Sequence, residues 1–128
     1  MAEESYPEDL RYHPEHDWAR IEGETATFGI TWYAQDALGE VVFYEPPETG
    51  KQVTKDQAYA EVESVKAVSD VIAPLSGEII EVNTALGDAP ETINSDPYGE
   101  GWLVKVRLSD PSETDALLDQ AAYVGTLG

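Results

Sequence analysis

The chain has 128 residues, of which 41% are hydrophobic, 26% charged and 9% aromatic, and this is enough for one compact domain with a sizeable core. It contains no cysteine, which excludes disulfide bridges, thiol catalysis and cysteine-ligated metal centres and agrees with a reducing compartment. The first ten residues are acidic without an apolar core, and no stretch approaches the about 20 apolar residues of a membrane span. We therefore expect neither a signal peptide nor a membrane segment, and a cytoplasmic location.

The charge is strongly one-sided, with 26 acidic residues against 7 basic ones and a formal net charge of −19. Residues 1–64 hold 15 acids and 4 bases and the remaining residues hold 11 and 3, so the excess is spread along the chain. Such a surface repels phosphate, and we expect neither nucleic acid nor an anionic membrane as a partner. Halophilic adaptation to a salty cytoplasm would explain the acidity, because dissolved salt screens self-repulsion.

Short strands separated by turn residues dominate the pattern in chain order. Residues 25–31 and 40–45 are rich in β-branched and aromatic types, which predicts two strands, and residues 32–38 between them have the composition of a helical turn closed by Gly39. Further strands are predicted at residues 59–63, 68–72, 78–82 and 102–108, with a turn at 74–77. A short helix is predicted over residues 112–124, with Ser112 and Asp115 arranged like a capping box.

The sequence also partly repeats itself. Residues 39–42 (GEVV) are followed by Gly50, and residues 77–80 (GEII) are followed by Gly87, at glycine spacings of 11 and 10. This pattern suggests two related half-sheets that face one another, because each short sheet must bury its apolar face.

Lys66 is one of four lysines, and it lies where two strand-like runs meet without glycine or proline (residues 61–71, EVESVKAVSDV). If the two runs pair as a hairpin, residues 64–67 form the turn and Lys66 projects from its tip. A modifying enzyme could then grip the backbone and reach the amine, and an arm attached there could enter other proteins. The alternative is an ordinary solvated turn lysine.

Four motifs in order resemble the glycine cleavage system H-protein family, and together they span about residues 12–127. They are residues 16–18 (HDW), 29–39 (GITWYAQDALG), 63–83 (ESVKAVSDVIAPLSGEIIEVN) and 94–103 (NSDPYGEGWL). The chain departs from the family pattern at Asp17, Trp32, Pro46 and the Tyr59-Ala60 pair, where the family usually has Glu, an acidic residue, Leu and two smaller residues.

The resemblance implies a mostly β fold of the biotinyl/lipoyl-like type, a flattened barrel or sandwich hybrid of two antiparallel half-sheets with a short C-terminal helix. Residues 1–128 would form a single lipoyl-carrier domain, and residues 1–11 would be a flexible N-terminal extension.

The resemblance also implies a non-catalytic carrier with lipoate bound as an amide to Lys66, on a hairpin that includes Glu63, Ser64, Val65 and Ala67. The implied partners are a pyridoxal-phosphate glycine decarboxylase (P protein), a tetrahydrofolate-dependent aminomethyltransferase (T protein) and dihydrolipoyl dehydrogenase (L protein). The carrier would take the aminomethyl group of glycine from the first to the second and present the dithiol to the third. A lipoate ligase or lipoyl transferase would attach the arm.

Physical chemistry adds a requirement for a protective cleft. An aminomethyl thioether hydrolyses readily in water, and its cationic amine favours a nearby carboxylate. By their positions in the matching motifs, Asp17 and Asp70 are the candidate cleft acids, with His16 beside them.

Other functions remain open at this stage. An H-like protein that relays lipoyl groups to other lipoyl domains would use the same Lys66, and a small acid–base hydrolase could use His16 and Asp17. A biotin carrier is disfavoured because that family places methionines beside its lysine. His13 and His16 are not expected to hold a metal, because Pro14 disfavours the helix that would align them.

Overall fold

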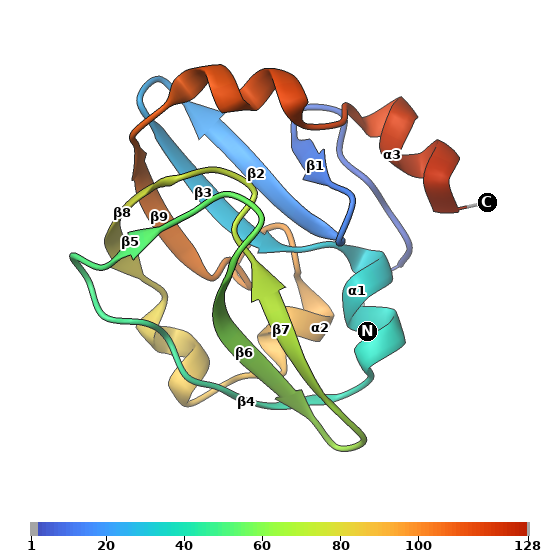
Figure 1. Cartoon of the computed structure of the whole chain (residues 1–128). Helices are drawn as coiled ribbons and strands as arrows, with labels where there is room; N and C mark the ends of the chain where they lie inside the picture. The colour runs from blue at the N-terminus through green and yellow to red at the C-terminus, as the bar shows by residue number, and fades with distance from the viewer. Residues whose placement is uncertain (1–2, 128) are drawn as a thin grey trace.

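The computed structural model describes residues 3–127, and strands form most of its regular structure (Figure 1). The strands are β1 (Arg11–His13), β2 (Asp17–Glu22), β3 (Thr25–Ile30), β4 (Val41–Tyr44), β5 (Gln52–Val53), β6 (Ala58–Ser64), β7 (Val68–Ile72), β8 (Gly77–Val82) and β9 (Val104–Leu108). The helices are α1 (Trp32–Leu38), α2 (Thr92–Ser95) and α3 (Gln120–Leu127), with 3-10 turns at η1 (Thr84–Gly87) and η2 (Pro111–Ala116).

The strands form two antiparallel sheets. One has six strands in the order β1-β2-β3-β9-β8-β5, and the other has three in the order β4-β6-β7. Within residues 3–127 the outer strands of the two sheets do not pair with each other, so no barrel closes. The predicted mostly β fold with two antiparallel sheets and a C-terminal helix is confirmed.

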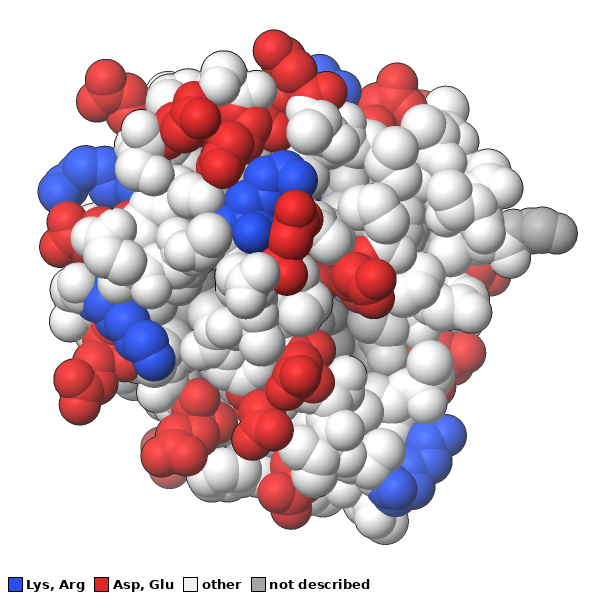
Figure 2. All heavy atoms as spheres, in the orientation of Figure 1, with Lys and Arg blue, Asp and Glu red and all other residues white. Residues whose placement is uncertain are grey.

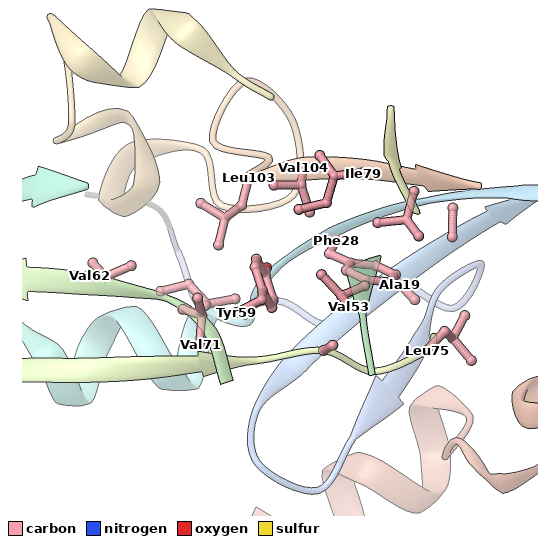
Figure 3. Packing of buried hydrophobic residues seen from close by; sticks show 14 of the residues in the cluster. Ala19, Phe28, Val53, Tyr59, Val62, Val71, Leu75, Ile79, Leu103 and Val104 are labelled. Atoms are coloured by element: carbon pink, nitrogen blue, oxygen red, sulfur yellow. The ribbon is translucent and has the colours of Figure 1, made fainter. Parts of the chain in front are cut away.

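The main core lies between the two sheets (Figure 3). Phe28 and Ile79 enter it from the six-stranded sheet, and Val62 and Val71 enter it from the three-stranded one. Tyr59 lies between these groups, with its ring 6.1 Å from that of Phe28. Burying side chains of this size stabilises the domain by about 1.5–3 kcal/mol each, which holds the two sheets face to face.

The repeated segments lie in different sheets, because β4 belongs to the three-stranded sheet and β8 to the six-stranded one. The two segments also touch, since the backbone N–H of Gly50 donates to the carbonyl of Ile79 at 2.7 Å. The internal similarity therefore follows the division into two facing sheets.

The C-terminal region differs from the single predicted helix over residues 112–124. Its first part is the 3-10 turn η2, and the chain is extended at Leu117 before α3 begins at Gln120. Leu118 exchanges two backbone hydrogen bonds of 2.8 Å with Tyr12, and this bridge interrupts the helix. The cap is Asp110, whose carboxylate accepts from the N–H of Ser112, so the predicted capping box is wrong.

Segments that precede β1 contact the body of the domain. The ring of Tyr6 packs edge-on against Tyr123, and the carbonyl of Ser5 accepts from the Tyr98 hydroxyl at 2.7 Å. These contacts show where residues 5 and 6 lie. The flexibility expected for residues 1–11 stays a prediction.

Among the described residues, no helix has the length and apolar character needed to cross a membrane.

Candidate functional site: the Lys66 hairpin and its groove

Strands β6 and β7 form a hairpin that projects from the body of the domain, with Lys66 in its turn (Figure 1). The last strand pair before the turn is Glu63 with Val68, so the turn lies between Ser64 and Ala67, as the sequence predicts. The side chain of Lys66 is exposed, and its amine is accessible to another protein.

The turn is held by a serine side chain. Ser64 is buried, and its hydroxyl accepts from the N–H groups of Ala67 (3.0 Å) and Lys66 (3.3 Å) while donating to the carbonyl of Ala67 (3.2 Å). Neither Val65 nor Lys66 is among the non-glycine residues with positive φ, so the turn needs no glycine. Ser64 therefore fixes the backbone from which Lys66 projects.

The tip of the hairpin is held by a second network, centred on Asn94. The buried Asn94 amide accepts from the N–H of Val41 (2.8 Å) and donates to the carbonyl of Gly39 (2.9 Å) and to the side chain of Gln35 (3.0 Å). These bonds fix both neighbours of Glu40, whose carbonyl accepts from the N–H of Val65 at 3.1 Å. Asn94 thus positions the hairpin tip through Glu40.

Gly39 makes room for the lysine stem. It ends α1 with a φ of 86°, a conformation that favours glycine, and a Cβ placed there would lie 3.2 Å from Cε of Lys66. The lysine side chain therefore passes directly over the end of α1.

A groove of about 550 Å³ begins beside the hairpin tip and runs between α1 and β7. Its apolar walls are Ala34, Ala37, Leu38, Ala67, Val68 and Ile72. A smaller cavity of about 40 Å³ shares His16 and Asp70 with the groove and is also lined by Asp17. The three predicted cleft residues therefore gather at one place, beside the hairpin that carries Lys66.

Asp17 is buried at the inner end of this region. The N–H of Ile72 donates to its Oδ1 at 3.3 Å, but burial dominates and raises the pKa of Asp17 well above its ordinary value of 3.8. Asp70 is exposed and lies on β7, opposite Glu61. The two candidate acids thus differ in environment, one enclosed and one open to water.

His16 has a left-handed backbone conformation with φ of 74°, and its Nδ1 lies 2.7 Å from the Tyr123 hydroxyl. That hydroxyl is also 2.9 Å from Oγ1 of Thr31, which caps α1. Burial lowers the pKa of His16, so its ring is neutral at pH 7 and stacks obliquely near Tyr33. Tyr123 on α3 thus holds both His16 and Thr31, and Thr31 caps the first turn of α1, the helix that forms one wall of the groove.

Among the described residues, no hydrogen bond joins His16 to Asp17, so the dyad required by a hydrolase is not formed. His13 lies elsewhere and pairs with Asp56, its Nε2 being 2.6 Å from Oδ1. Across residues 3–127 no group of three or more side chains is arranged to hold a metal ion.

Sequence reasoning missed several residues of this site. Asn94 was visible only as a member of the motif at residues 94–103, without an assigned task. Tyr123 lies in the predicted C-terminal helix, but no local signal relates it to His16, which is 107 positions away. Glu15 also lines the groove, and nothing in its neighbourhood distinguished it from the other acids.

Together, the fold and the site define a small two-sheet domain that presents one lysine on a braced hairpin, next to a groove with apolar walls and a polar end. This is the architecture of a domain that carries a side arm. The comparisons with known proteins specify the class further.

The family model described as glycine cleavage H-protein matches residues 10–128. A glycine cleavage system H protein from Symbiobacterium thermophilum is 56% identical over 117 residues, covering 91% of both chains, and one from Halorhodospira halophila is 55% identical over 118 residues with the same coverage. The crystal structure of such a protein from Mycobacterium marinum superposes with a TM-score of 0.88 at 44% identity, covering 96% of this chain and 99% of that one. The chain belongs to the glycine cleavage H-protein family.

Proposed function

We propose that the chain is the lipoyl-lysine carrier of a glycine cleavage system and that Lys66 is the attachment residue. The observation that carries this proposal is the exposed Lys66 on a braced hairpin whose flank opens into the groove between α1 and β7. Residues 1–128 would act as one carrier domain, without turnover of their own.

Attachment requires the Lys66 amine in its deprotonated form. Nζ would attack the carbonyl carbon of an activated lipoyl group, such as an acyl adenylate, so that the amide C–N bond forms as AMP leaves and the amine proton passes to the enzyme or to water. The product has lost the lysine charge, which makes the extended side chain more compatible with the apolar groove.

The groove suits a lipoyl arm because its walls are apolar where a hydrocarbon chain would lie and polar where a cationic amine would end. When bound, the arm supplies a dithiolane that carries a one-carbon amine unit and accepts two electrons. Ala34, Leu38 and Ala67 would contact its chain, and their apolar surfaces would exclude water.

We propose that Asp17, Asp70 and His16 form the polar end. Asp17 is enclosed, so a cationic amine beside it would favour its ionised form and gain a charge-assisted hydrogen bond in a low-dielectric setting. Asp70 stands at the outer part of the same cavity. His16, held by Tyr123, would present a neutral ring that adds no repulsion to the amine.

The proposed partners are those of the glycine cleavage system: the decarboxylase, the aminomethyltransferase, dihydrolipoyl dehydrogenase, and a lipoate ligase or lipoyl transferase. We propose a cytoplasmic location, because the absence of cysteine agrees with a reducing compartment. The charge of −19 would suit a salt-rich cytoplasm, where screening shortens the range of repulsion.

The test of attachment is intact-mass analysis and peptide mapping after incubation with lipoate ligase, ATP and lipoate, with Lys66→Ala as the matched variant. A lipoyl-sized increment that maps to Lys66 and is absent from the variant is the expected result. No increment, under conditions that modify an authentic lipoyl domain, would contradict the proposal.

The cleft assignment needs a separate measurement. With the loaded carrier, Asp17→Asn is expected to shorten the half-life of the aminomethylated arm while leaving attachment unchanged. An unchanged half-life would show that Asp17 does not hold the amine.

A further inference from the structure

Exposed apolar side chains gather around the lysine hairpin. Of the six large apolar residues that are exposed within the described part of the chain, four are Val42, Phe43, Val65 and Val68, with exposed fractions of 45, 52, 71 and 58%. Val42 and Phe43 belong to β4, Val65 lies in the turn that carries Lys66, and Val68 follows that turn. In a chain with a net charge of −19, this concentration at one place sets the surface apart from its surroundings.

The strand register arranges part of this cluster as a row. Phe43 on β4 pairs with Glu63 on β6, and Glu63 pairs with Val68 on β7, so the three side chains cross the outer face of the three-stranded sheet. Beside the row lies a hollow of about 270 Å³, to which Pro46 and Pro47 also contribute. The surface therefore offers a depression lined by both apolar and acidic side chains, beside the hairpin that carries Lys66.

Carboxylates surround this depression. Glu45, Glu61 and Glu63 line it with exposed side chains, and Lys51 is the one basic residue among its lining residues. Over the face drawn in Figure 2, acidic side chains far outnumber basic ones. A protein that covers the depression must place apolar side chains in it and must meet the carboxylates with lysine or arginine.

We propose that the outer face of the three-stranded sheet around Phe43 and Val68, with the exposed Val42 and Val65 next to it and the acidic rim of Glu45, Glu61 and Glu63, is the docking surface for the enzyme that acylates Lys66. We call it the β4–β7 face. The docking partner would present an apolar side chain to the hollow and a basic rim around it. This inference rests on the proposed function, since it presupposes that Lys66 is acylated.

The length of the unmodified lysine side chain indicates which partner binds the β4–β7 face. An acylating enzyme meets the chain before any arm is attached, so it must bring Nζ of Lys66 to its own active site within the length of a lysine side chain. It therefore has to cover residues in the turn and next to it, such as Val65 and Val68. Enzymes that act on the loaded carrier are reached by a much longer arm and can dock farther away.

The β4–β7 face is also separate from most of the groove. The groove lies on the α1 side of β7, whereas Phe43 and Val42 lie on β4, and only Val68 lines both hollows. Substitutions on β4 therefore perturb docking without changing the walls that would receive the arm.

The test compares steady-state attachment of lipoate by a lipoate ligase with ATP, with the apo chain as the varied substrate and intact mass as the readout. The variants are Phe43→Ser and Val42→Ser, and the control is Val124→Ser, which replaces an exposed valine on α3. We expect Phe43→Ser to raise KM for the apo chain by about tenfold with kcat unchanged, Val42→Ser to raise it less, and Val124→Ser to leave it unchanged. Glu63→Lys should also raise KM, and most strongly at low salt.

Several results would overturn the proposal. One is an unchanged KM for Phe43→Ser in folded protein, with folding checked by circular dichroism, and another is an equal rise for Val124→Ser. If Phe43→Ser lost reaction with only the decarboxylase or only the aminomethyltransferase, the face would belong to that partner instead. If the wild-type chain self-associated and Phe43→Ser abolished this, the face would belong to a second copy of the chain. If the wild-type chain itself is never acylated, the proposed function fails together with this inference, whereas normal acylation of Phe43→Ser refutes the inference alone.

Discussion

The buried carboxyl group of Asp17 makes a prediction about stability that does not depend on any partner. We expect Asp17→Asn to stabilise the fold at neutral pH. Asparagine has nearly the same shape and can still accept the hydrogen bond from the N–H of Ile72, but it carries no charge that must be removed from water. The gain in unfolding free energy should depend on pH, and the form of this dependence identifies the buried charge of Asp17 as its cause.

The direction of the pKa shift gives the sign of the pH dependence of stability, and one titrating proton sets its upper limit. Burial raises the pKa of Asp17 above its ordinary value of 3.8, so between that value and the raised one the folded protein keeps a proton that the unfolded chain has lost. Wild-type stability therefore decreases as pH rises through this window, by at most about 1.4 kcal/mol per pH unit. Because Asn cannot ionise, the difference between variant and wild type should be small below pH 3.8 and should grow above it.

The assay is urea unfolding of both proteins at several pH values between 3.5 and 8, each followed by circular dichroism in high salt. Asp70→Asn serves as the control, because it removes one acidic group at an exposed position of the same hairpin. Any change in the free energy of unfolding that Asp70→Asn also shows is an effect of net charge and not of burial. If Asp17→Asn were destabilising at pH 7, or if its effect were independent of pH, the reasoning from burial would be wrong.

Four other outcomes are expected. Tyr59→Phe should raise the free energy of unfolding by about 1 kcal/mol in urea titrations, because the buried Tyr59 hydroxyl has no hydrogen-bond partner among the described residues; a loss of stability would mean that it is satisfied by a buried water. Asn94→Ala should cost about 3 kcal/mol in the same assay, because it leaves the N–H of Val41 unpaired, and it should also slow arm attachment measured by intact mass. Gly77→Ala should cost more than about 2 kcal/mol in thermal unfolding, because a Cβ there would collide with the carbonyl of Arg107. The unfolding midpoint of the wild type should rise between low and molar KCl, and a flat curve would contradict screening of the −19 charge.

The sequence was most informative where periodicity and turn residues agreed. Strands β3, β4, β6, β7 and β8 and helix α1 lie within one or two residues of their predicted bounds. The hairpin at Lys66 was predictable because two strand-like runs meet without a breaker, and its assignment as an attachment site came from the family resemblance. Local physics alone favoured an ordinary solvated turn lysine.

The sequence was least informative where a contact joins distant segments. Strand β2 begins at Asp17, a charged residue that the fold buries, so its pattern conceals its position in the six-stranded sheet. The break between η2 and α3 depends on the pairing of Leu118 with Tyr12 across more than a hundred positions. Local helix propensity favours a continuous helix there, and the tertiary bridge overrides it.

The carrier role places two demands on the hairpin, and different sides of it meet them. In the salt-rich cytoplasm proposed above, specific docking would need an apolar surface, because salt limits charge attraction to short range and does not weaken hydrophobic contact. Protection of a loaded arm needs enclosure, which α1 and β7 supply around Ala34 and Leu38. Since the bonds of Ser64 and Asn94 fix the turn relative to both surfaces, a partner bound to the β4–β7 face would find Lys66 in one position, and the groove would stay formed while it is bound.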